Sequence, residues 1–476
     1  MTSSTAPIEE FDLIIIGAGS GNSIPAPELK HLKIAIVDDG RWFGGTCLNA
    51  GCIPTKMFVR PADLVRNVRE AGRLGVSTAE VSLDWAAVRD RVFGRIDPIS
   101  QSGEQYRASG EANISLVRET VRFTGMHELT TASGRVLRAT QIVIGGGSRP
   151  RELEVLPFGE TVFSSDDAMR LEHLPERIAV VGGGVVAAEF SAIYSGFGAH
   201  VTQLNRSELF RGLDHDIAET FTEVGSRNWQ IRAGIEITEA KQTAAGWTLT
   251  LSDSSTLEVD AVLVAVGRVP NSDRLATPEV GFDHEEDGRL SVDAYQQVLK
   301  NGKPVGGVFA LGDISSPHQL KHVANHDARV VARNLLAEAR IARGEDAQLT
   351  ENTLGPVPYT VFSAPEIAVF GMSLPEAQAA GYKAIEVRQD YGGTAWGWAL
   401  EDEDSFCKLV VERGSGVILG AHIIGPDSPI LLQPLLQAAS FGQSIRGLAR
   451  GQYWPHPAAT EIIENALLQA EEEIQK

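Results

Sequence analysis

Cysteine is scarce in this chain, with three residues among 476, and no apolar run is long enough to cross a bilayer. So few cysteines cannot form the disulfide framework of a small secreted protein. The stretch MTSSTAPIEEFD has no cationic flank and no apolar segment before Phe11, so we expect no secretory signal. These absences disfavour a membrane protein and a secreted scaffold, and we expect a cytoplasmic protein.

Positive charge is also in short supply, since 42 Lys and Arg face 62 Asp and Glu and the formal net charge is −20. An acidic surface repels phosphate backbones and anionic lipids, so we expect no nucleic acid and no membrane among the partners. A length of 476 residues exceeds what one hydrophobic core serves, which predicts several domains.

Two distant segments share the pattern of an apolar strand, a glycine turn and a helix. The first is DLIIIGAGSGN at 12–22, followed by the strand KIAIVDD at 33–39. The second is RIAVVGGGVVAAEF at 177–190, followed by the strand HVTQLNR at 200–206. A strand, a glycine turn and a helix N-terminus together cradle a pyrophosphate, so the sequence predicts two dinucleotide sites.

The first glycine turn contains Gly17, Gly19 and Gly21, and Asp38 ends the next strand 21 residues after Gly17. A carboxylate at that place holds a ribose hydroxyl, so this site suits a nucleotide with a free ribose.

The segment after this turn departs from the motif. Its last position is Asn22 rather than glycine, and Pro25 and Pro27 follow closely. Because proline is tolerated only in the first turn of a helix, we expect the helix here to be short or displaced.

The second unit has Gly182 and Gly184, followed by Ala187, and its next strand ends without an acid. Arg206 stands there instead, with Arg211 a little further on. Arginine grips a phosphate in two places where a carboxylate would repel it, so the second site is predicted to bind NADP(H).

Two of the three cysteines lie together in GGTCLNAGCIPTK at 44–56, as Cys47 and Cys52. Zinc sites usually need a second such pair or clustered histidines, and Cys407 is alone, so no metal site is predicted. Pro54 favours a helix beginning near Cys52, and a helix N-terminus stabilises a thiolate. A reversible disulfide is the interpretation that fits this spacing best.

These segments together resemble the class I pyridine nucleotide-disulfide oxidoreductases, whose redox signature is GGTCxNxGCxPxK. The resemblance also takes in GRVPN at 267–271, Gly312-Asp313 and the HPxxxE pattern from His456 to Glu461, and so covers nearly the whole chain. It implies an α/β fold with two Rossmann-type dinucleotide-binding domains, for FAD and NADPH, and a C-terminal α+β dimerisation domain. The boundaries we expect are 1–152 and 279–348 for the FAD-binding domain, 153–278 for the NADPH-binding domain and 349–476 for the dimerisation domain.

The resemblance also implies the residues of the two cofactor sites. Those of the FAD site are Gly17, Gly19, Ser20, Gly21, Asp38, Gly45, Thr46, Lys56, Gly147, Gly312 and Asp313. Those of the NADPH site are Gly182, Gly184, Val185, Arg206, Arg211 and Gly267.

By the same resemblance, Cys52 is the thiol beside the flavin and Cys47 is the thiol that attacks a substrate disulfide. Lys56 lies near the flavin and pairs with Glu189.

The family also supplies an acid. His456, held by Glu461, protonates the leaving thiolate and reaches across from the second subunit of a homodimer.

Several positions depart from the family pattern. Residues 145–147 are GGG where ATG is frequent, Ala458 replaces a threonine, and Val185 replaces an aromatic gate over the nicotinamide. His318 and Lys321 could face the nicotinamide or the substrate, but we interpret them as the packed start of a helix.

The absence of residues that bind substrate or cofactor in related enzymes narrows the choice of substrate. Pro27 stands where glutathione reductases have a substrate-binding arginine, Arg206 where NAD-dependent lipoamide enzymes have a glutamate, and no cysteine pair follows Cys407. GAGSGNSI, LGDISSPHQLKHVANHDARVVARNLL and YGGTAWGWALEDED resemble the mycothione-reducing members, which implies mycothione as the substrate. Two alternatives stay open: an NAD-dependent dihydrolipoamide dehydrogenase and a non-catalytic flavoprotein redox sensor.

Overall fold

The computed structural model describes residues 7–81 and 83–476. The chain divides into two units, each made of several segments. The described residues of Met1–Met57, Ala87–Arg151 and Gly267–Thr353 form the first, and those of Phe58–Ala86, Glu152–Val266 and Leu354–Lys476 form the second. Within the described residues, none of the helices has the length and apolar character that spanning a bilayer requires.

An eight-stranded sheet forms the centre of the first unit, in the order β17-β18-β6-β1-β2-β3, with β5 beside β6 and β4 beside β5. The strands β18, β6, β1, β2 and β3 are parallel to one another. The bounds are β1 Ile8–Ile16, β2 Ile34–Val37, β3 Ile114–Val117, β4 Val121–Gly125, β5 Glu128–Thr131, β6 Val136–Ile144, β17 Gln297–Lys300 and β18 Lys303–Ala310.

The strand β1 is buried on both faces, as its unbroken run of apolar residues predicts. Ile14 and Ile16 belong to the apolar core on one side of the sheet, and Leu13 and Ile15 to the core on the other side. Successive side chains of a strand point to opposite faces, so a central parallel strand needs apolar residues at every position.

The parallel register brings four strand ends to one edge of this sheet. Ile16 pairs with Val37 on one side and with Ile144 on the other, and Ile144 pairs with Ala310. The residues that follow these ends are Gly17, Asp38, Gly145 and Leu311. Ligands of open α/β sheets bind outside the carboxyl ends of the strands, so this edge is the expected nucleotide site.

The segment after the first glycine turn forms no α-helix. Two short 3-10 turns replace it, η1 Ser20–Ser23 and η2 Pro27–Leu29, which confirms the expectation from Pro25 and Pro27. Arg107 holds the segment in place, because its Nε donates to Asn22 Oδ1 and its Nη2 to Asn22 O, both at 2.8 Å.

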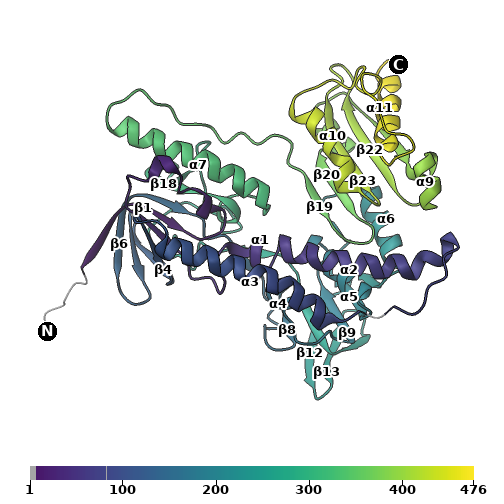
Figure 1. The fold of residues 1–476 in the computed structure, drawn as a ribbon, viewed down its shortest axis with the longest axis horizontal. Helices are drawn as coiled ribbons and strands as arrows, with labels where there is room; N and C mark the ends of the chain where they lie inside the picture. Colours follow the sequence, from purple (N-terminus) through teal and green to yellow (C-terminus); the bar gives the residue numbers. More distant parts are fainter. Residues whose placement is uncertain (1–6, 82) are drawn as a thin grey trace. The chain divides into compact units, whose positions relative to one another are not determined.

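The other helical segments of the first unit flank the sheet, and α7 lies over β18 (Figure 1). Two of them, α2 and α3, continue into the second unit. The bounds are α1 Gly45–Asn49, α2 Cys52–Glu70, α3 Trp85–Ser109, η4 Gly312–Ile314 and α7 Lys321–Ala342. A two-stranded ladder joins β7 Ser148–Pro150 to β16 Arg268–Pro270.

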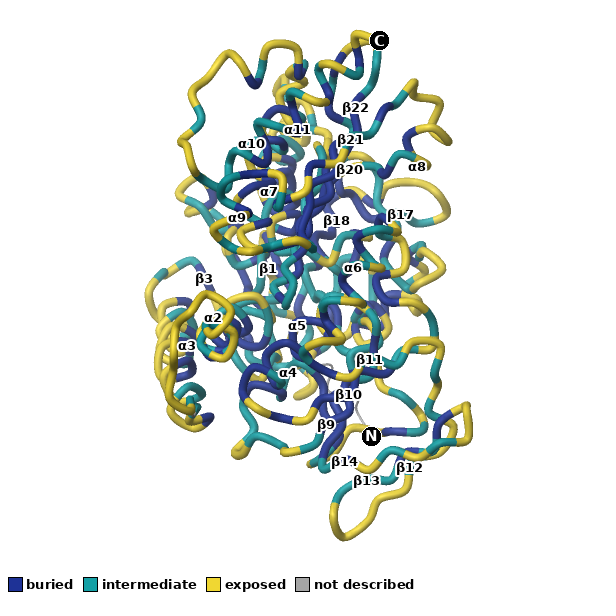
Figure 2. The backbone as a smooth tube through the Cα atoms, turned by 90° about the vertical axis from the view of Figure 1, so that its right-hand side faces the viewer, coloured by how far each residue is buried: buried dark blue, intermediate teal, exposed yellow. Residues whose placement is uncertain are grey.

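The second unit begins with a five-stranded parallel sheet in the order β11-β10-β9-β15-β8, with a three-stranded antiparallel sheet β12-β13-β14. Figure 2 shows β9 and β10 buried, whereas β12 is largely exposed. The bounds are β8 Val162–Phe163, α4 Ser165–Ala168, β9 Arg177–Val181, α5 Val185–Gly196, β10 His200–Asn205, α6 His215–Gly225, β11 Gln230–Ala233, β12 Ile237–Thr243, β13 Gly246–Leu251, β14 Thr256–Val259 and β15 Ala261–Val264.

The C-terminal part of the second unit is an antiparallel sheet in the order β19-β20-β23-β22-β21, covered by α10 and α11 (Figure 1). Together with the two glycine-turn sheets, it confirms the predicted fold class. The bounds are β19 Tyr359–Val361, β20 Ile367–Gly371, α8 Leu374–Ala379, β21 Ala384–Asp390, η5 Tyr391–Gly393, α9 Ala395–Leu400, β22 Phe406–Glu412, β23 Ile418–Ile424, α10 Ser428–Ser440 and α11 Glu461–Glu473.

A buried ion cluster joins α6 of the parallel sheet to this antiparallel sheet. Lys408 Nζ lies 2.8 Å from Asp214 Oδ2, 3.1 Å from Asp216 Oδ2 and 3.0 Å from Glu386 Oε1, and its side chain is 7% exposed. Burial favours the neutral amine, but the hydrogen bonds to the three carboxylates outweigh it and raise the pKa of Lys408. Lys408 is therefore positively charged at neutral pH.

Replacing this lysine tests its contribution to stability. We expect Lys408→Met to lower the midpoint of thermal unfolding by several degrees, because leaving buried carboxylates without their cation costs about 3–5 kcal/mol. Lys383→Met, at an exposed site immediately before β21, is the matched control. Equal midpoints for the two variants, measured by circular dichroism, would contradict this account.

Candidate active site

The first glycine turn closes against the sheet edge in a way that only glycine allows. Gly17 has φ +97°, and a Cβ there would lie 2.2 Å from Gly145 O. Its N–H donates to Val37 O at 2.7 Å, so the turn is tied to the neighbouring strand. Gly19, Ser20 and Gly21 follow, with Ser20 and Gly21 in the first turn of η1.

Asp38 lies beside this turn, at the place that the sequence predicts for a ribose-binding acid. Its Oδ2 accepts from Ala18 N at 2.7 Å and its Oδ1 from Gly40 N at 3.1 Å. Arg118, which the sequence analysis did not single out, pairs with the same carboxylate. Burial raises the pKa of Asp38 despite these hydrogen bonds and the arginine charge.

Asp313 follows the end of β18, within η4, and is bound by a second loop. Ser148 Oγ donates to Asp313 Oδ2 at 2.6 Å and accepts from Arg268 Nε at 2.8 Å. Gly147, in the same loop, has its carbonyl bound by Asn271 N at 3.0 Å. Arg268 belongs to the GRVPN segment, whereas Ser148 belongs to no motif of the sequence, and only the contacts of the two residues reveal that they bind Asp313 together.

Gly312 is also fixed by hydrogen bonding. Its N–H donates to Asp327 Oδ2 at 3.1 Å, and the other oxygen of that buried carboxylate accepts from Asn352 Nδ2 at 3.0 Å. The Gly312-Asp313 turn is thereby held from the side of α7.

The two cysteines lie on consecutive helices that the intervening glycine separates. Cys47 is in the short helix α1, which begins at Gly45 and contains Thr46, and Cys52 is the first residue of α2. Asn49 Nδ2 donates to Phe43 O at 2.9 Å and to Gly45 O at 3.0 Å. These bonds tie the end of α1 to the residues at and before its start. The predicted helix start near Cys52 is confirmed.

The Cys47 and Cys52 side chains are thiols rather than a disulfide, and they lie within hydrogen-bonding reach of each other. The hydrogen bond with Cys52 is the largest cause that raises the pKa of Cys47, followed by burial, while the positive charge of Lys321 acts in the opposite direction. The pair is therefore one chemical unit. Cys407 lies in β22, fully buried, and burial raises its pKa to about 12, so it is inert by comparison.

The second glycine turn, in the second unit, leads from β9 into α5. Gly182 is buried, Gly184 is the N-cap of α5, and Val185 is its first residue. Arg206 follows the end of β10, whose Leu204 pairs with Val181 at the end of β9. Arg206 and Arg211 are exposed, and neither guanidinium has an ion pair or hydrogen bond with another described residue. They are available to a phosphate at this edge.

The remaining predicted residues lie in different segments. Lys56 is in the first turns of α2, whereas Glu189 is buried in α5 and its Oε1 accepts from Phe362 N at 3.0 Å. Their pairing stays a prediction. Gly267 belongs to the first unit, where its carbonyl accepts from Arg151 N at 2.9 Å.

The structure brings the predicted acid and its partner together. His456 Nδ1 lies 3.5 Å from Glu461 Oε2, with the histidine exposed and the glutamate at the start of α11. Glu461 can therefore orient the ring so that Nε2 points to solvent.

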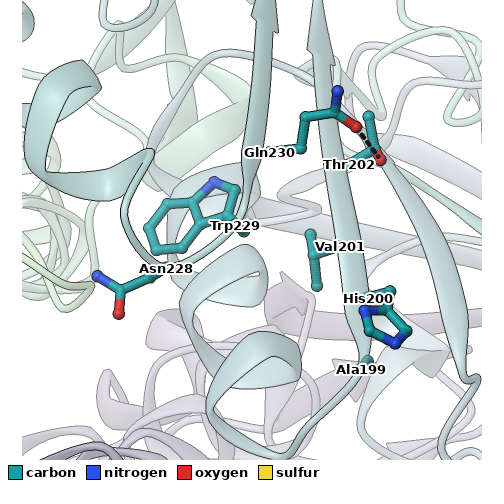
Figure 3. Close-up of a pocket in the computed structure, with 7 residues that line it drawn as sticks. All are labelled: Ala199, His200, Val201, Thr202, Asn228, Trp229 and Gln230. Carbon is teal, nitrogen blue, oxygen red and sulfur yellow. Dashed lines mark hydrogen bonds between the residues drawn. The ribbon is translucent and has the colours of Figure 1, made fainter. Parts of the chain in front are cut away.

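A cavity of about 250 Å³ lies at the other edge of the second parallel sheet (Figure 3). His200 and Gln230, which line it, are the first residues of β10 and β11, and Thr202 Oγ1 donates to Gln230 Oε1 at 3.1 Å. Nucleotides bind outside the carboxyl ends of parallel strands, so this cavity is not part of the dinucleotide site.

Comparison with known proteins decides the family. Residues 11–328 match the family described as pyridine nucleotide-disulphide oxidoreductase, and residues 357–467 match its dimerisation domain. The chain belongs to this family of enzymes. It is a flavoprotein disulfide reductase, and its cofactors are FAD and NADPH, as the resemblance implied.

Several relatives align over almost the whole chain. Mycothione reductase of Mycobacterium tuberculosis is 45% identical over 97% of this chain and 99% of its own length. Dihydrolipoyl dehydrogenase of Synechocystis sp. is 31% identical over 97% and 99%, and glutathione reductase of Burkholderia cepacia is 31% identical over 90% and 92%. The solved structure of an HOCl-induced flavoprotein disulfide reductase from Escherichia coli has the same fold, with a TM-score of 0.81, 22% identity, and coverage of 96% and 99%.

The residues present fit both cofactors. At the first site, a turn that a Cβ would fill and an acid at the end of β2 suit the pyrophosphate and ribose of FAD. At the second, Arg206 and Arg211, whose guanidinium groups have no partner among residues 7–81 and 83–476, suit the 2′-phosphate of NADPH.

The glycine turn can be tested by one methyl group. We expect Gly17→Ala to reduce bound FAD severalfold, because the new Cβ would meet Gly145 O and left-handed backbone is strained for alanine. The measurement is the ratio of flavin to protein absorbance after purification. Gly94→Ala, in α3 with no atom within 4 Å of the new Cβ, is the control. Full FAD content in Gly17→Ala would refute the role of this glycine turn in binding FAD.

The two arginines can be tested through cofactor choice. We expect the double variant Arg206→Ala/Arg211→Ala to raise KM for NADPH about tenfold or more, since hydrogen bonds to a charged group contribute about 1.5–3 kcal/mol. KM for NADH should stay unchanged, because NADH lacks the 2′-phosphate. Ferricyanide reduction measures both without a disulfide substrate. Arg333→Ala, at an exposed site on α7, is the control, and a parallel rise for both nucleotides would argue against phosphate binding.

Proposed function

We propose that this enzyme reduces mycothione to two molecules of mycothiol at the expense of NADPH. The observation that carries the proposal is the 45% identity to mycothione reductase over 97% of the chain, against 31% for the lipoamide and glutathione enzymes. The local structure supports it, because two 3-10 turns, the second of which begins at Pro27, occupy the segment where glutathione reductases have a substrate-binding arginine.

Thiol–disulfide exchange divides the work between the two cysteines. The Cys47 thiolate attacks one sulfur of the substrate, so that a Cys47–substrate disulfide forms and the first product thiolate leaves. Cys52 then attacks the Cys47 sulfur, which releases the second product thiol and leaves a Cys47–Cys52 disulfide. When bound, FAD and NADPH supply the two electrons that return this disulfide to two thiols.

Each departing thiolate needs a proton, and His456 is the group we assign to supply it. A histidine side chain can donate a proton at neutral pH, and the carboxylate of Glu461, 3.5 Å from Nδ1, fixes the orientation of the ring. His456 would act on the active site of the other subunit, so a homodimer is the functional form. The dimerisation domain supports that assembly, and we place the dimer in the cytoplasm.

The experiment that tests this function offers the purified protein mycothione, glutathione disulfide and lipoamide in parallel, with NADPH or NADH. We expect mycothione with NADPH to have the highest kcat/KM, by at least about tenfold. Activity with lipoamide and NADH alone would instead identify a dihydrolipoyl dehydrogenase. No turnover of any disulfide would favour a redox sensor.

The chemistry of the pair has its own control. Cys47→Ala should abolish disulfide turnover while NADPH still reduces the flavin, since the nucleophile is missing and the nucleotide sites are intact. Cys407→Ala changes the third, buried cysteine and should retain turnover.

A further inference from the structure

Lys321, the first residue of α7, points its ammonium group to the first glycine turn. Its Nζ donates to Ser20 Oγ at 2.9 Å, and Ser20 Oγ donates to Asn325 Oδ1 at 3.1 Å, one helical turn further along α7. Among the described residues, no carboxylate forms a salt bridge with Lys321. The lysine is half-buried, so its charge is less screened than that of a surface lysine.

The same turn contacts the redox segment. A Cβ on Gly45 would lie only 2.7 Å from Gly19 Cα, so the beginning of α1 packs directly on the residue before Ser20. Cys47 is two residues after Gly45. The ammonium of Lys321 is therefore bound to Ser20, next to the glycine on which α1 packs, and Cys47 lies in that same short helix.

Cys47 needs such a cation more than Cys52 does. The thiolate is the nucleophile, and both the neighbouring thiol and burial oppose its formation. Cys52 is the first residue of α2, which has 19 residues, so the positive end of a long helix favours its thiolate. Cys47 lies within a helix of 5 residues and has no comparable dipole.

We propose that Lys321, held by Ser20 and Asn325, is the cation that stabilises the Cys47 thiolate. The positive charge of Lys321 lowers the pKa of Cys47, in opposition to burial and the neighbouring thiol, which raise it. This role deepens the proposed function, since it rests on Cys47 being the attacking thiol. Lys321 is a positioning residue in this scheme, because it acts through the sulfur and not on the substrate.

The test measures the reactivity of Cys47 alone. In a Cys52→Ala background, with FAD bound, the rate of reaction with an aromatic disulfide (5,5′-dithiobis-2-nitrobenzoate) is followed from pH 5 to pH 10. We expect Lys321→Gln to move the profile to higher pH and to lower the rate at neutral pH about threefold or more. If the loss of the charge raises the Cys47 pKa by about one unit, about tenfold less thiolate is present at neutral pH. A thiolate of higher pKa is more nucleophilic, so the rate falls by less than tenfold.

Lys321→Arg should keep the profile of the parent protein, because it keeps the charge. Lys303→Gln, at an exposed site on β18, should do the same. Asn325→Ala keeps the lysine but removes the side chain that binds Ser20, the partner of Lys321, and should move the profile in the same direction by less. It also serves as the second variant if Lys321→Gln does not fold.

An unchanged profile in Lys321→Gln would overturn the proposal. Loss of FAD with an unchanged profile would also overturn it and reassign the lysine to the cofactor. A shift of the pH profile by the same amount in Lys303→Gln would mean that the net charge of the protein causes the effect, and it would also refute the proposal. The assay contains no mycothione, so an error in the substrate assignment would leave its outcome unaffected.

Discussion

The parallel pairing of β18, β6, β1 and β2 is the constraint on which the first unit depends. In a parallel sheet the strands end on the same edge, and the register pairs Ile16 with Val37 and with Ile144. Segments more than 250 residues apart in the sequence therefore deliver a glycine turn, an acid and the Gly312-Asp313 turn to one place. A slip of one residue in this register would turn every buried side chain of β1 to the opposite face, so the apolar cores hold the site in alignment.

The sequence predicts those parts of this arrangement that local chemistry decides. The run of apolar residues before Gly17 can only be a buried strand, and Pro25 and Pro27 exclude a long helix whatever the rest of the fold does. The fold class, both glycine turns and the helix start at Cys52 follow from such local rules, and the structure confirms them. The three domain boundaries and the Lys56–Glu189 pair stay predictions.

Contacts between distant segments could not be predicted in this way. Arg107 binds Asn22 in the segment that forms no α-helix, and Ser148 binds Asp313. Neither Arg107 nor Ser148 belongs to a motif of the sequence. The first contact depends on how α3 packs beside the first glycine turn, and the second on how β7 packs beside the Gly312-Asp313 turn. No local pattern in the sequence predicts either arrangement. Lys321 shows the same limit: we interpreted it as the packed start of a helix, and its bond to Ser20 becomes visible only when α7 is folded against that turn.

The absence of an α-helix after the first turn changes the electrostatics of this site. Such a helix normally presents its positive N-terminus to the pyrophosphate, and η1, with 4 residues, cannot supply a comparable dipole. Positive charge must then come from side chains, and Lys321 is bound to the turn itself. Cys47 of the nearby redox pair is stabilised as a thiolate by the same charge, while the dipole of α2 stabilises the thiolate of Cys52. The two sulfurs thus have separate sources of stabilisation, which lets each thiolate form at its own step of the exchange.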